Sequence, residues 1–417
     1  MRKLLLLTLL IIPLHVYKSV AQDNTEKPVI KVGGYIRTET FYDTYRSVES
    51  RDGESYNYPV KRGLDAAGND TNRINQFTML SLQSRFKISA SGVSAFGAKV
   101  SSLIEADFLG MGDDSKFMVG LRHAYARLDW NKTQLLLGQT WTLMSISEFA
   151  ANTVLFASGT TFQPQIRAAQ ARLTYQLADK LKLSGAIMGY TTHHPIEPKG
   201  NNSQRNSGLP AIDAQFQYGS INNLFFALTY GYQFLKPYLT TSAGTARYEA
   251  TKIVSSYHLQ ACLGYKLPIM TLKVQGNLTQ NFTNAGLIGG YLPVEGSVNA
   301  KGEYDYANIT VVTTWFDVES TGNKFKPGLF IGYAENLGTN KNVIASKPYT
   351  SDLCRNSDIR SLLRIAPRFY YISGPVDIGV EYIRNSAVYG TFRKQSVKDA
   401  QDPTVNNRFL VSVRYTF

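Results

Sequence analysis

Hydrophobic and polar residues alternate with a period of two through most of the chain. Such alternation is typical of extended strands with one apolar and one wet face. The last of these segments shows it best, because its two faces carry Phe409, Val411, Val413, Tyr415 and Phe417 against Arg408, Leu410, Ser412, Arg414 and Thr416. The pattern predicts sixteen strands, at 33–44, 77–90, 95–108, 117–130, 133–140, 165–177, 180–190, 209–218, 223–234, 252–266, 269–281, 303–316, 324–335, 359–373, 376–387 and 405–417.

The connections between these strands alternate between short and long. Tight links such as Asn131-Lys132 and Ala178-Asp179 are separated by long ones at 45–76, 109–116, 141–164, 191–208, 235–251, 282–302, 336–358 and 388–404. Outer-membrane barrels have short periplasmic turns and longer outer loops, whereas a soluble sandwich gives no reason for strict alternation. We therefore expect an all-β fold, a transmembrane antiparallel β-barrel of about 16 strands, wide enough to leave an aqueous channel.

Aromatic residues stand at the ends of the strands that should run down to the periplasm. Rings favour the level of the lipid headgroups, so these positions predict the periplasmic girdle of a barrel. After Gln22, charges or Gly, Asn and Ser interrupt every hydrophobic run before the roughly 18 residues that a membrane helix needs. The predicted girdle residues are Trp130, Tyr175, Tyr218, Tyr265, Trp315, Tyr371 and Tyr415.

The N-terminus has the three parts of a secretory signal peptide. Arg2 and Lys3 precede an apolar run, and the small residues Ser19 and Ala21 precede Gln22. We expect cleavage after Ala21 and export to a bacterial outer membrane. The expected organisation is a signal peptide at 1–21, a short periplasmic segment at 22–32 and the barrel at 33–417.

The chain is basic, with a formal net charge of +13, and removal of Arg2, Lys3 and Lys18 with the signal peptide would leave +10. A basic surplus favours anionic partners. Nucleic acid is not expected, because no helix or motif concentrates the cations. We prefer an anion-attracting pore. A disulfide is not expected either, because the topology puts Cys262 and Cys354 on opposite sides of the membrane.

The connection at 141–164 is too apolar for a solvated loop. Its hydrophobic residues need burial, and a barrel of this size offers it if this third outer loop folds inwards as a constriction. The alternative is a loop packed against a neighbouring subunit. Glu148 could line the pore or be a surface charge. The apolar residues are Leu143, Met144, Ile146, Phe149, Val154, Leu155 and Phe156.

Several cations fall on faces that should point into the lumen. Alternation would stack Arg360, Arg364 and Arg368 down one wall, and inward parity is also expected for Arg85, Lys87, Arg172, Arg408 and Arg414. Rows of fixed cations select anions electrostatically, and Arg holds carboxylates with two hydrogen bonds. The alternative is that wall carboxylates neutralise these cations, the candidates being Glu105, Asp107, Asp213 and Glu381.

Arg122 and Arg127 have opposite parity in one strand, so regular alternation requires one of them to face outwards. A midplane Arg facing lipid costs ~2 to 4 kcal/mol. A subunit contact would tolerate it better, and Arg37, Glu39 and Arg167 fit the same hypothesis that the N-terminal strands form such a contact.

The motifs Gly120-Leu121-Arg122-His123-Ala124-Tyr125, Leu136-Leu137-Gly138-Gln139-Thr140-Trp141 and Gln163-Pro164-Gln165-Ile166-Arg167 resemble those of DcaP-type trimeric porins. Gly33-Gly34-Tyr35-Ile36, Ser84-Arg85-Phe86 and Ile104-Glu105-Ala106-Asp107-Phe108 look similar as well, so the match covers about 33–175. The resemblance implies a 16-stranded homotrimer that passively admits small anionic solutes, with Arg85, Arg122 and Arg167 in the matching motifs. The terminal Phe417 is similar to the aromatic that the barrel assembly machinery reads in bacterial porins.

Together these features predict a passive outer-membrane channel that needs no cofactor. An enzyme is not expected, because no nucleophile and base stand in recognisable motifs and His193-His194-Pro195 lacks diagnostic metal-ligand spacing. An adhesive or structural barrel with little transport is the alternative, since long loops such as 45–76 could bind other surfaces.

Overall fold

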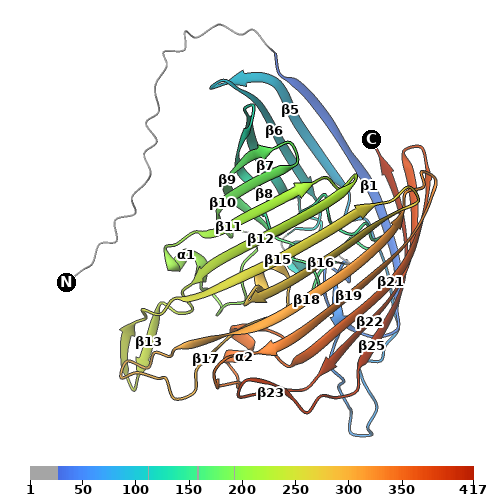
Figure 1. The fold of residues 1–417 in the computed structure, drawn as a ribbon. Coiled ribbons are helices and arrows are strands. Elements are labelled where there is room, and N and C mark those ends of the chain that lie inside the picture. Colours follow the sequence, from blue (N-terminus) through green and yellow to red (C-terminus); the bar gives the residue numbers. More distant parts are fainter. Residues whose placement is uncertain (1–26, 111, 157–158, 192) are drawn as a thin grey trace.

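A computed structural model describes residues 27–110, 112–156, 159–191 and 193–417. Within these residues, sixteen antiparallel spans close into one barrel, counting β4 and β5 as a single interrupted span. The predicted fold class is thus confirmed (Figure 1). The expected signal peptide lies outside the described residues. No helix among those described is long and apolar enough to cross a membrane.

The wall follows chain order around the barrel. Its spans are β1 (Val29–Asp43), β4 (Gln76–Leu80) with β5 (Arg85–Ala95), β6 (Ala98–Asp107), β7 (Gly120–Asp129), β8 (Thr133–Trp141), β9 (Arg167–Ala178), β10 (Leu181–Gly189), β11 (Ala211–Gly219), β12 (Leu224–Leu235), β15 (Val254–Lys266), β16 (Met270–Gln280), β18 (Tyr306–Ser320), β19 (Phe325–Gly338), β21 (Ile359–Ser373), β22 (Val376–Tyr389) and β25 (Thr404–Thr416). The first strand begins four residues before the expected start, because its pairing with β5 runs on to Val29.

The loops carry the remaining elements. Three hairpins lie in them, β2 (Ser47–Ser50) with β3 (Ser55–Pro59), β13 (Thr240–Ala243) with β14 (Ala246–Glu249), and β23 (Thr391–Arg393) with β24 (Ser396–Lys398). Two short strands, β17 (Gly289–Pro293) and β20 (Cys354–Arg355), pair with each other. The helices are short: α1 (Ser203–Ser207), α2 (Tyr349–Asp352) and the 3-10 turns Asp113–Ser115 and Thr283–Ala285.

The barrel closes where the last strand meets the first. Tyr35 to Asp43 of β1 pair with Thr416 to Arg408 of β25, and Gly34 and Phe417 exchange two backbone hydrogen bonds of 3.0 Å. A Cβ on Gly34 would lie 2.2 Å from the Arg85 carbonyl oxygen and 3.0 Å from the Phe417 ring. Only glycine therefore lets the C-terminal ring sit at this closure, and a closed sheet leaves no edge for lipid to satisfy.

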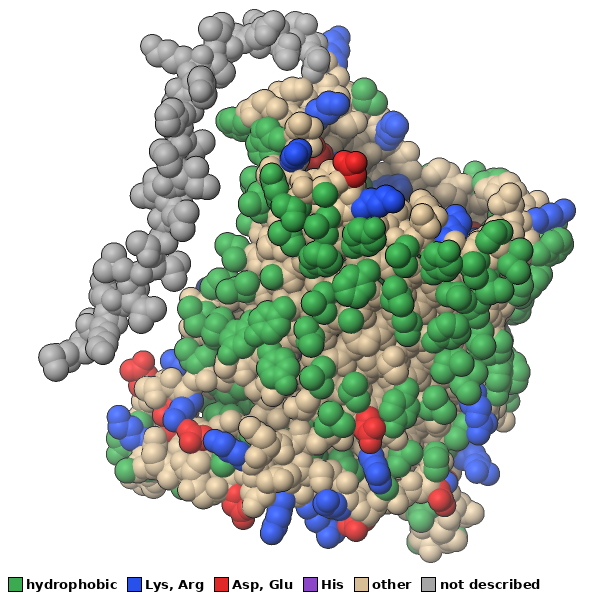
Figure 2. Space-filling view, in the orientation of Figure 1, with side chains coloured by type: hydrophobic (Ala, Val, Ile, Leu, Met, Phe, Trp, Pro, Cys, Tyr) green, Lys and Arg blue, Asp and Glu red, His purple; other side chains and the backbone are tan. Residues whose placement is uncertain are grey.

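Side chains alternate between lipid and lumen as the sequence predicts. On β25, Phe409, Val411 and Val413 are exposed, whereas Arg408, Leu410 and Ser412 are buried. Figure 2 shows the result: a belt of hydrophobic side chains crosses the strands, and charged side chains gather above and below it. Most girdle positions are exposed, but Trp315 is not a girdle residue. Its strand continues to Ser320 and its ring is buried inside the barrel.

One wall span is interrupted. The sequence predicts a single strand at 77–90, but the chain turns between β4 and β5, where Ser84 N–H donates to the Ser81 carbonyl (3.2 Å) and Leu82 and Gln83 are buried. Among the described residues both cysteine thiols are free, Cys262 in β15 and Cys354 in the seventh long loop.

Candidate functional site

The third loop, of which the structure describes residues 142–156 and 159–166, lies against inward-facing polar side chains of the wall. The side-chain amide of Gln215 donates to the Leu143 carbonyl (2.9 Å), and that of Gln260 donates to the Met144 carbonyl (2.8 Å). Asn277 and Thr313 both donate to the Phe162 carbonyl, at 3.2 and 2.8 Å. Buried carbonyl groups need such donors, so the wall supplies the hydrogen bonds that an irregular segment lacks.

Aromatic rings of the third loop complete its docking. The Phe149 ring stacks on Phe225, with centroids 5.1 Å apart, and lies 5.5 Å from Trp315. The Phe162 ring packs over Gly332, where a Cβ would come within 2.6 Å of it. Most apolar residues of this loop are therefore buried inside the barrel, while Ile146 and Phe156 are half-buried beside a cavity, which explains why the sequence is too hydrophobic for solvent.

The first loop also enters the barrel, which the sequence did not predict. Tyr56 and Tyr58 of its β2–β3 hairpin are fully buried. Arg364 of the wall donates to the carbonyls of Tyr56 and Asn57. Arg408 donates to the Gly53 carbonyl (2.7 Å). Two loops, rather than one, thus fill part of the lumen.

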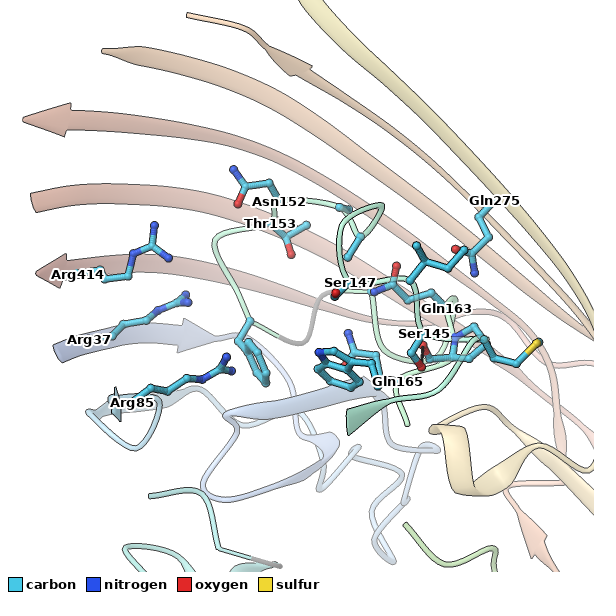
Figure 3. Close-up of a pocket in the computed structure, with 18 of the residues that line it drawn as sticks. Arg37, Arg85, Ser145, Ser147, Asn152, Thr153, Gln163, Gln165, Gln275 and Arg414 are labelled. Carbon is cyan, nitrogen blue, oxygen red and sulfur yellow. Dashed lines mark hydrogen bonds between the residues drawn. The ribbon is translucent and has the colours of Figure 1, made fainter. Parts of the chain in front are cut away.

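Two cavities lie on either side of the third loop. The turn-side cavity, of about 410 Å³, is lined by Arg37, Arg85 and Arg414 and by polar groups of the loop (Figure 3). The loop-side cavity, of about 400 Å³, is lined by four other cations, Arg51, Arg122, Arg167 and Arg355. Both cavities share the same three side chains, Trp141, Phe156 and Gln165.

Several of these cations are paired with carboxylates. Arg85 lies 3.3 Å from Glu105, and Arg122 lies 3.1 Å from Glu105 and also pairs with Asp107. The Phe156 ring covers both guanidinium groups, at 4.7 Å from Arg85 and 5.2 Å from Arg122. The Arg167 guanidinium lies 4.8 Å from the Trp141 ring, and no salt bridge to Arg167 is present among the described residues.

Several wall cations are neutralised by wall carboxylates, which was the alternative interpretation of the sequence. Arg368 makes a two-bond contact with Asp317 (2.7 and 3.0 Å), and Arg408 makes one with Asp43 (2.9 and 2.8 Å). Arg414 pairs with Asp377 at 2.7 Å but remains partly exposed to the turn-side cavity. These cations therefore stabilise the wall and the first loop, and they also add positive charge to the lumen.

Arg360 does not join Arg364 and Arg368. The pairing of β21 with β22 shifts between Ile359 and Ser361, so a bulge at Arg360 breaks the alternation. Arg360 is exposed on the lipid side, while Arg364 is fully buried inside. The prediction that three cations stack on the inward wall is thus wrong for Arg360. A bulge adds one unpaired residue to the strand, and regular alternation does not predict it.

A bulge also resolves the parity conflict in β7. Glu105 pairs with His123 and Ala106 with Leu121, so Arg122 is the extra residue. Its side chain turns inwards beside that of His123. Arg127 lies on the same face as His123, opposite the buried Leu136 of β8, and pairs with Asp129 (2.8 Å). The expectation that one Arg must face outwards is wrong, since both lie on the lumen side.

The suggested subunit contact through Arg37 and Glu39 is also wrong. Both side chains are buried on the inward face of β1 and pair at 2.7 Å. Arg37 further donates to Ser412 Oγ (2.9 Å) and to the Val154 carbonyl of the third loop. Arg37 therefore links the wall to the loop.

The remaining predicted residues are spread along the lumen. Arg172 donates to the Trp141 carbonyl at 3.4 Å. Lys87 is exposed on the inward face of β5, and Glu148 is exposed on the third loop outside the lining of either cavity. Arg37, Arg51 and Arg355 line cavities but were not predicted as pore residues. Parity could have found Arg37, whereas loop folding places the other two.

Titratable groups of the loop-side cavity depart from their usual behaviour. Burial, together with the positive Arg167 and Arg122, lowers the pKa of His193 to about 3, so this side chain is neutral at pH 7. Burial, with the nearby Glu39, raises the pKa of Glu54 to about 7. The cavity therefore carries less negative charge near neutral pH than its residues suggest.

Closed wall, apolar belt and polar lumen define a bacterial outer-membrane β-barrel of the porin type. Among solved structures, the chain is similar to the outer membrane channel DcaP of Acinetobacter baumannii (TM-score 0.67, 17% identity, 94% of this chain and 97% of that one). It is also similar to OmpT of Vibrio cholerae in its trimer form (0.55, 13%, 94% and 100%) and to an anion-selective porin from Comamonas acidovorans (0.53, 11%, 94% and 100%).

The expected resemblance to DcaP-type porins is thus confirmed at the level of the fold. No family model matches the sequence, and no curated protein matches it either.

Proposed function

We propose that the protein is a porin, a passive channel for small hydrophilic solutes that favours anions. The observation that carries this proposal is the turn-side cavity, where Arg37, Arg85 and Arg414 contribute to the lining and no carboxylate does among its described residues. Their partner carboxylates lie in the wall, so a solute entering the cavity meets guanidinium groups first. Fixed cations in a pore attract anions and repel cations.

The loop-side cavity supports the same preference. Its lining includes four Arg against three acidic residues, Glu49, Glu54 and Asp107. Asp107 is engaged by Arg122, and the raised pKa of Glu54 leaves it partly protonated at pH 7. The charge that a solute meets at the loop side is therefore also positive.

The third loop is the proposed constriction between the cavities. Trp141, Phe156 and Gln165 border both, so a solute that passes from one to the other passes these side chains. The rings are backed by cations at Arg85, Arg122 and Arg167. Such an arrangement favours carboxylates, which Arg binds with two parallel hydrogen bonds.

We further propose a homotrimer, assembled after export through a signal peptide. The support is the likeness in fold to an outer membrane protein solved in its trimer form and the similarity of the N-terminal motifs to DcaP-type porins. Phe417 is proposed as the signal for barrel assembly, since its ring and backbone complete the closure at Gly34.

Planar-bilayer recordings in a potassium chloride gradient test the anion preference. Wild-type protein should show a reversal potential on the anion side, and Arg85→Gln/Arg414→Gln should move it towards the cation side. The matched control is Arg360→Gln/Arg384→Gln, which removes two charges from the lipid-facing side. An absence of open-channel current, a cation preference of the wild type, or equal shifts in both variants would refute the proposal. A liposome-swelling panel of small dicarboxylates, sugars and amino acids would then rank the solutes.

A further inference from the structure

Two arginines face the membrane instead of the lumen. Arg384 follows the outward residues Ile378, Val380 and Tyr382 along β22, and it is exposed. The bulge in β21 places Arg360 on the same side. Neither makes an ion pair within the described part of the chain, whereas Arg368 on the inward face of β21 and Arg408 and Arg414 on the inward face of β25 all do.

Arg384 lies at the loop-side edge of the apolar belt, and Arg360 lies further towards the loops, since Arg384 pairs with Ile365. On the outward face of β22, Arg384 is the first polar residue after three apolar or aromatic ones. It pairs with Asn407 of β25, which is likewise the polar residue next to the outward Phe409 and Val411. Tyr382 donates to Asn407 Oδ1 at 2.8 Å. Aromatic residues and then polar ones mark the level of lipid headgroups, so Arg384 stands at that level and Arg360 lies beyond it on the loop side.

An apolar groove of about 500 Å³ runs below these arginines on the lipid side. Its lining comes from β4, β1, β25, β22 and β21 and is almost wholly apolar at the surface. The outward side chains that form it are Tyr42, Phe77, Phe369, Val380, Phe409 and Val411. Its upper end is Tyr382, two residues along the strand from Arg384.

We infer that this face binds an outer-leaflet lipid with a phosphorylated headgroup, the acyl chain lying in the groove and the phosphate on Arg384 and Arg360. A groove alone cannot choose among lipids, because every lipid has apolar chains. The unpaired guanidinium groups select a phosphorylated headgroup, since Arg binds phosphate with charge-assisted hydrogen bonds.

The spacing suits a headgroup with two phosphates. Ser361, beside Arg360, pairs with Val388, four residues from Arg384 on β22. Four residues of a strand span about 13 Å, which a phosphorylated disaccharide can bridge with both side chains extended. Glu335 lies on this side as the partner of Ser361, where it accepts a hydrogen bond from Tyr333 (3.1 Å). The lipid site is separate from the channel and does not depend on its selectivity.

Native mass spectrometry of the purified oligomer tests this inference. The probes are an acylated glucosamine disaccharide lipid with two phosphates, its dephosphorylated form, and inorganic phosphate. Wild-type protein should retain the phosphorylated lipid, and Arg360→Ser/Arg384→Ser should weaken retention by at least about tenfold. The control Lys180→Ser/Lys266→Ser removes two exposed cations at the turn-side rim and should retain the lipid as the wild type does.

Three results would overturn the inference. Equal retention of the dephosphorylated lipid by the wild type would show that the arginines do not select the headgroup, and this comparison needs no variant to fold. Full displacement of the lipid by inorganic phosphate would identify a free-anion site. Dissociation of the oligomer in the double variant, with lipid retention per protomer unchanged, would assign the face to a second copy of the chain.

Discussion

Replacement of Arg408 by alanine is expected to release the first loop and to destabilise the barrel. The Arg408 guanidinium is fully buried, holds Asp43 with two hydrogen bonds and lies between the rings of Phe41 and Tyr56, at 3.9 and 4.0 Å. The substitution leaves Asp43 buried with only the 2.7 Å hydrogen bond from Asn406 among the described side chains. Breaking a buried pair by removing one partner costs about 3 to 5 kcal/mol.

The assay is urea unfolding of the refolded protein in lipid vesicles, followed by tryptophan fluorescence, for Arg408→Ala, Asp43→Ala and the double variant. Each single variant should lose about 3 to 5 kcal/mol. The double variant should lose less than the sum, because it removes both charges of the buried pair and leaves only the partly exposed Glu49, 3.7 Å from Arg408 in the wild type, without its cation. Single-channel conductance should rise in Arg408→Ala, since the Gly53 carbonyl loses its donor. A loss below about 1 kcal/mol, or strict additivity, would refute the assigned role.

Three other predictions concern the selectivity and conductance of the channel. Because the pKa of Glu54 is raised to about 7, this side chain gains its negative charge as pH rises from 6 to 8. Anion selectivity, measured by reversal potential, should therefore fall over that range in the wild type. It should stay level in Glu54→Gln. Gly332→Val puts side-chain atoms where the Phe162 ring lies and should cost ~1 to 3 kcal/mol through overpacking, with a larger or noisier conductance; an unchanged current trace would contradict the docking of the third loop. Arg360→Ser should leave the reversal potential unchanged, because its side chain faces lipid, and a shift would place it in the lumen.

The wall was predictable because its physics is local. Alternation along β25 separates Phe409 and Val411 from Arg408 and Ser412, and the structure places them as lipid and lumen residues. The sixteen spans are confirmed, with one break at Leu82 and Gln83, because lipid on one side and water on the other impose a period of two on each strand.

The bulges and the first loop were not predictable in the same way. A single extra residue at Arg122 or at Arg360 inverts which face a side chain takes, and no composition signal marks it. The hairpin at 47–59 has the short alternation Tyr56, Tyr58, but its burial depends on Arg364 and Arg408, which lie more than 300 residues away in sequence. Contacts over such distances follow from closure of the barrel and not from local pattern.

The arginines of this protein therefore divide by their partners as well as by their face. Arg368 and Arg408 are locked by carboxylates and build the wall. Arg85 and Arg414 are paired at the wall yet remain lining residues of a cavity, so their fields reach a solute. Arg360 and Arg384 have no acidic partner in the described residues and face lipid. Counting inward cations alone overstates the charge of the pore, and the same pairing predicts that substitutions at Arg85 and Arg414 change selectivity more than substitutions at Arg368.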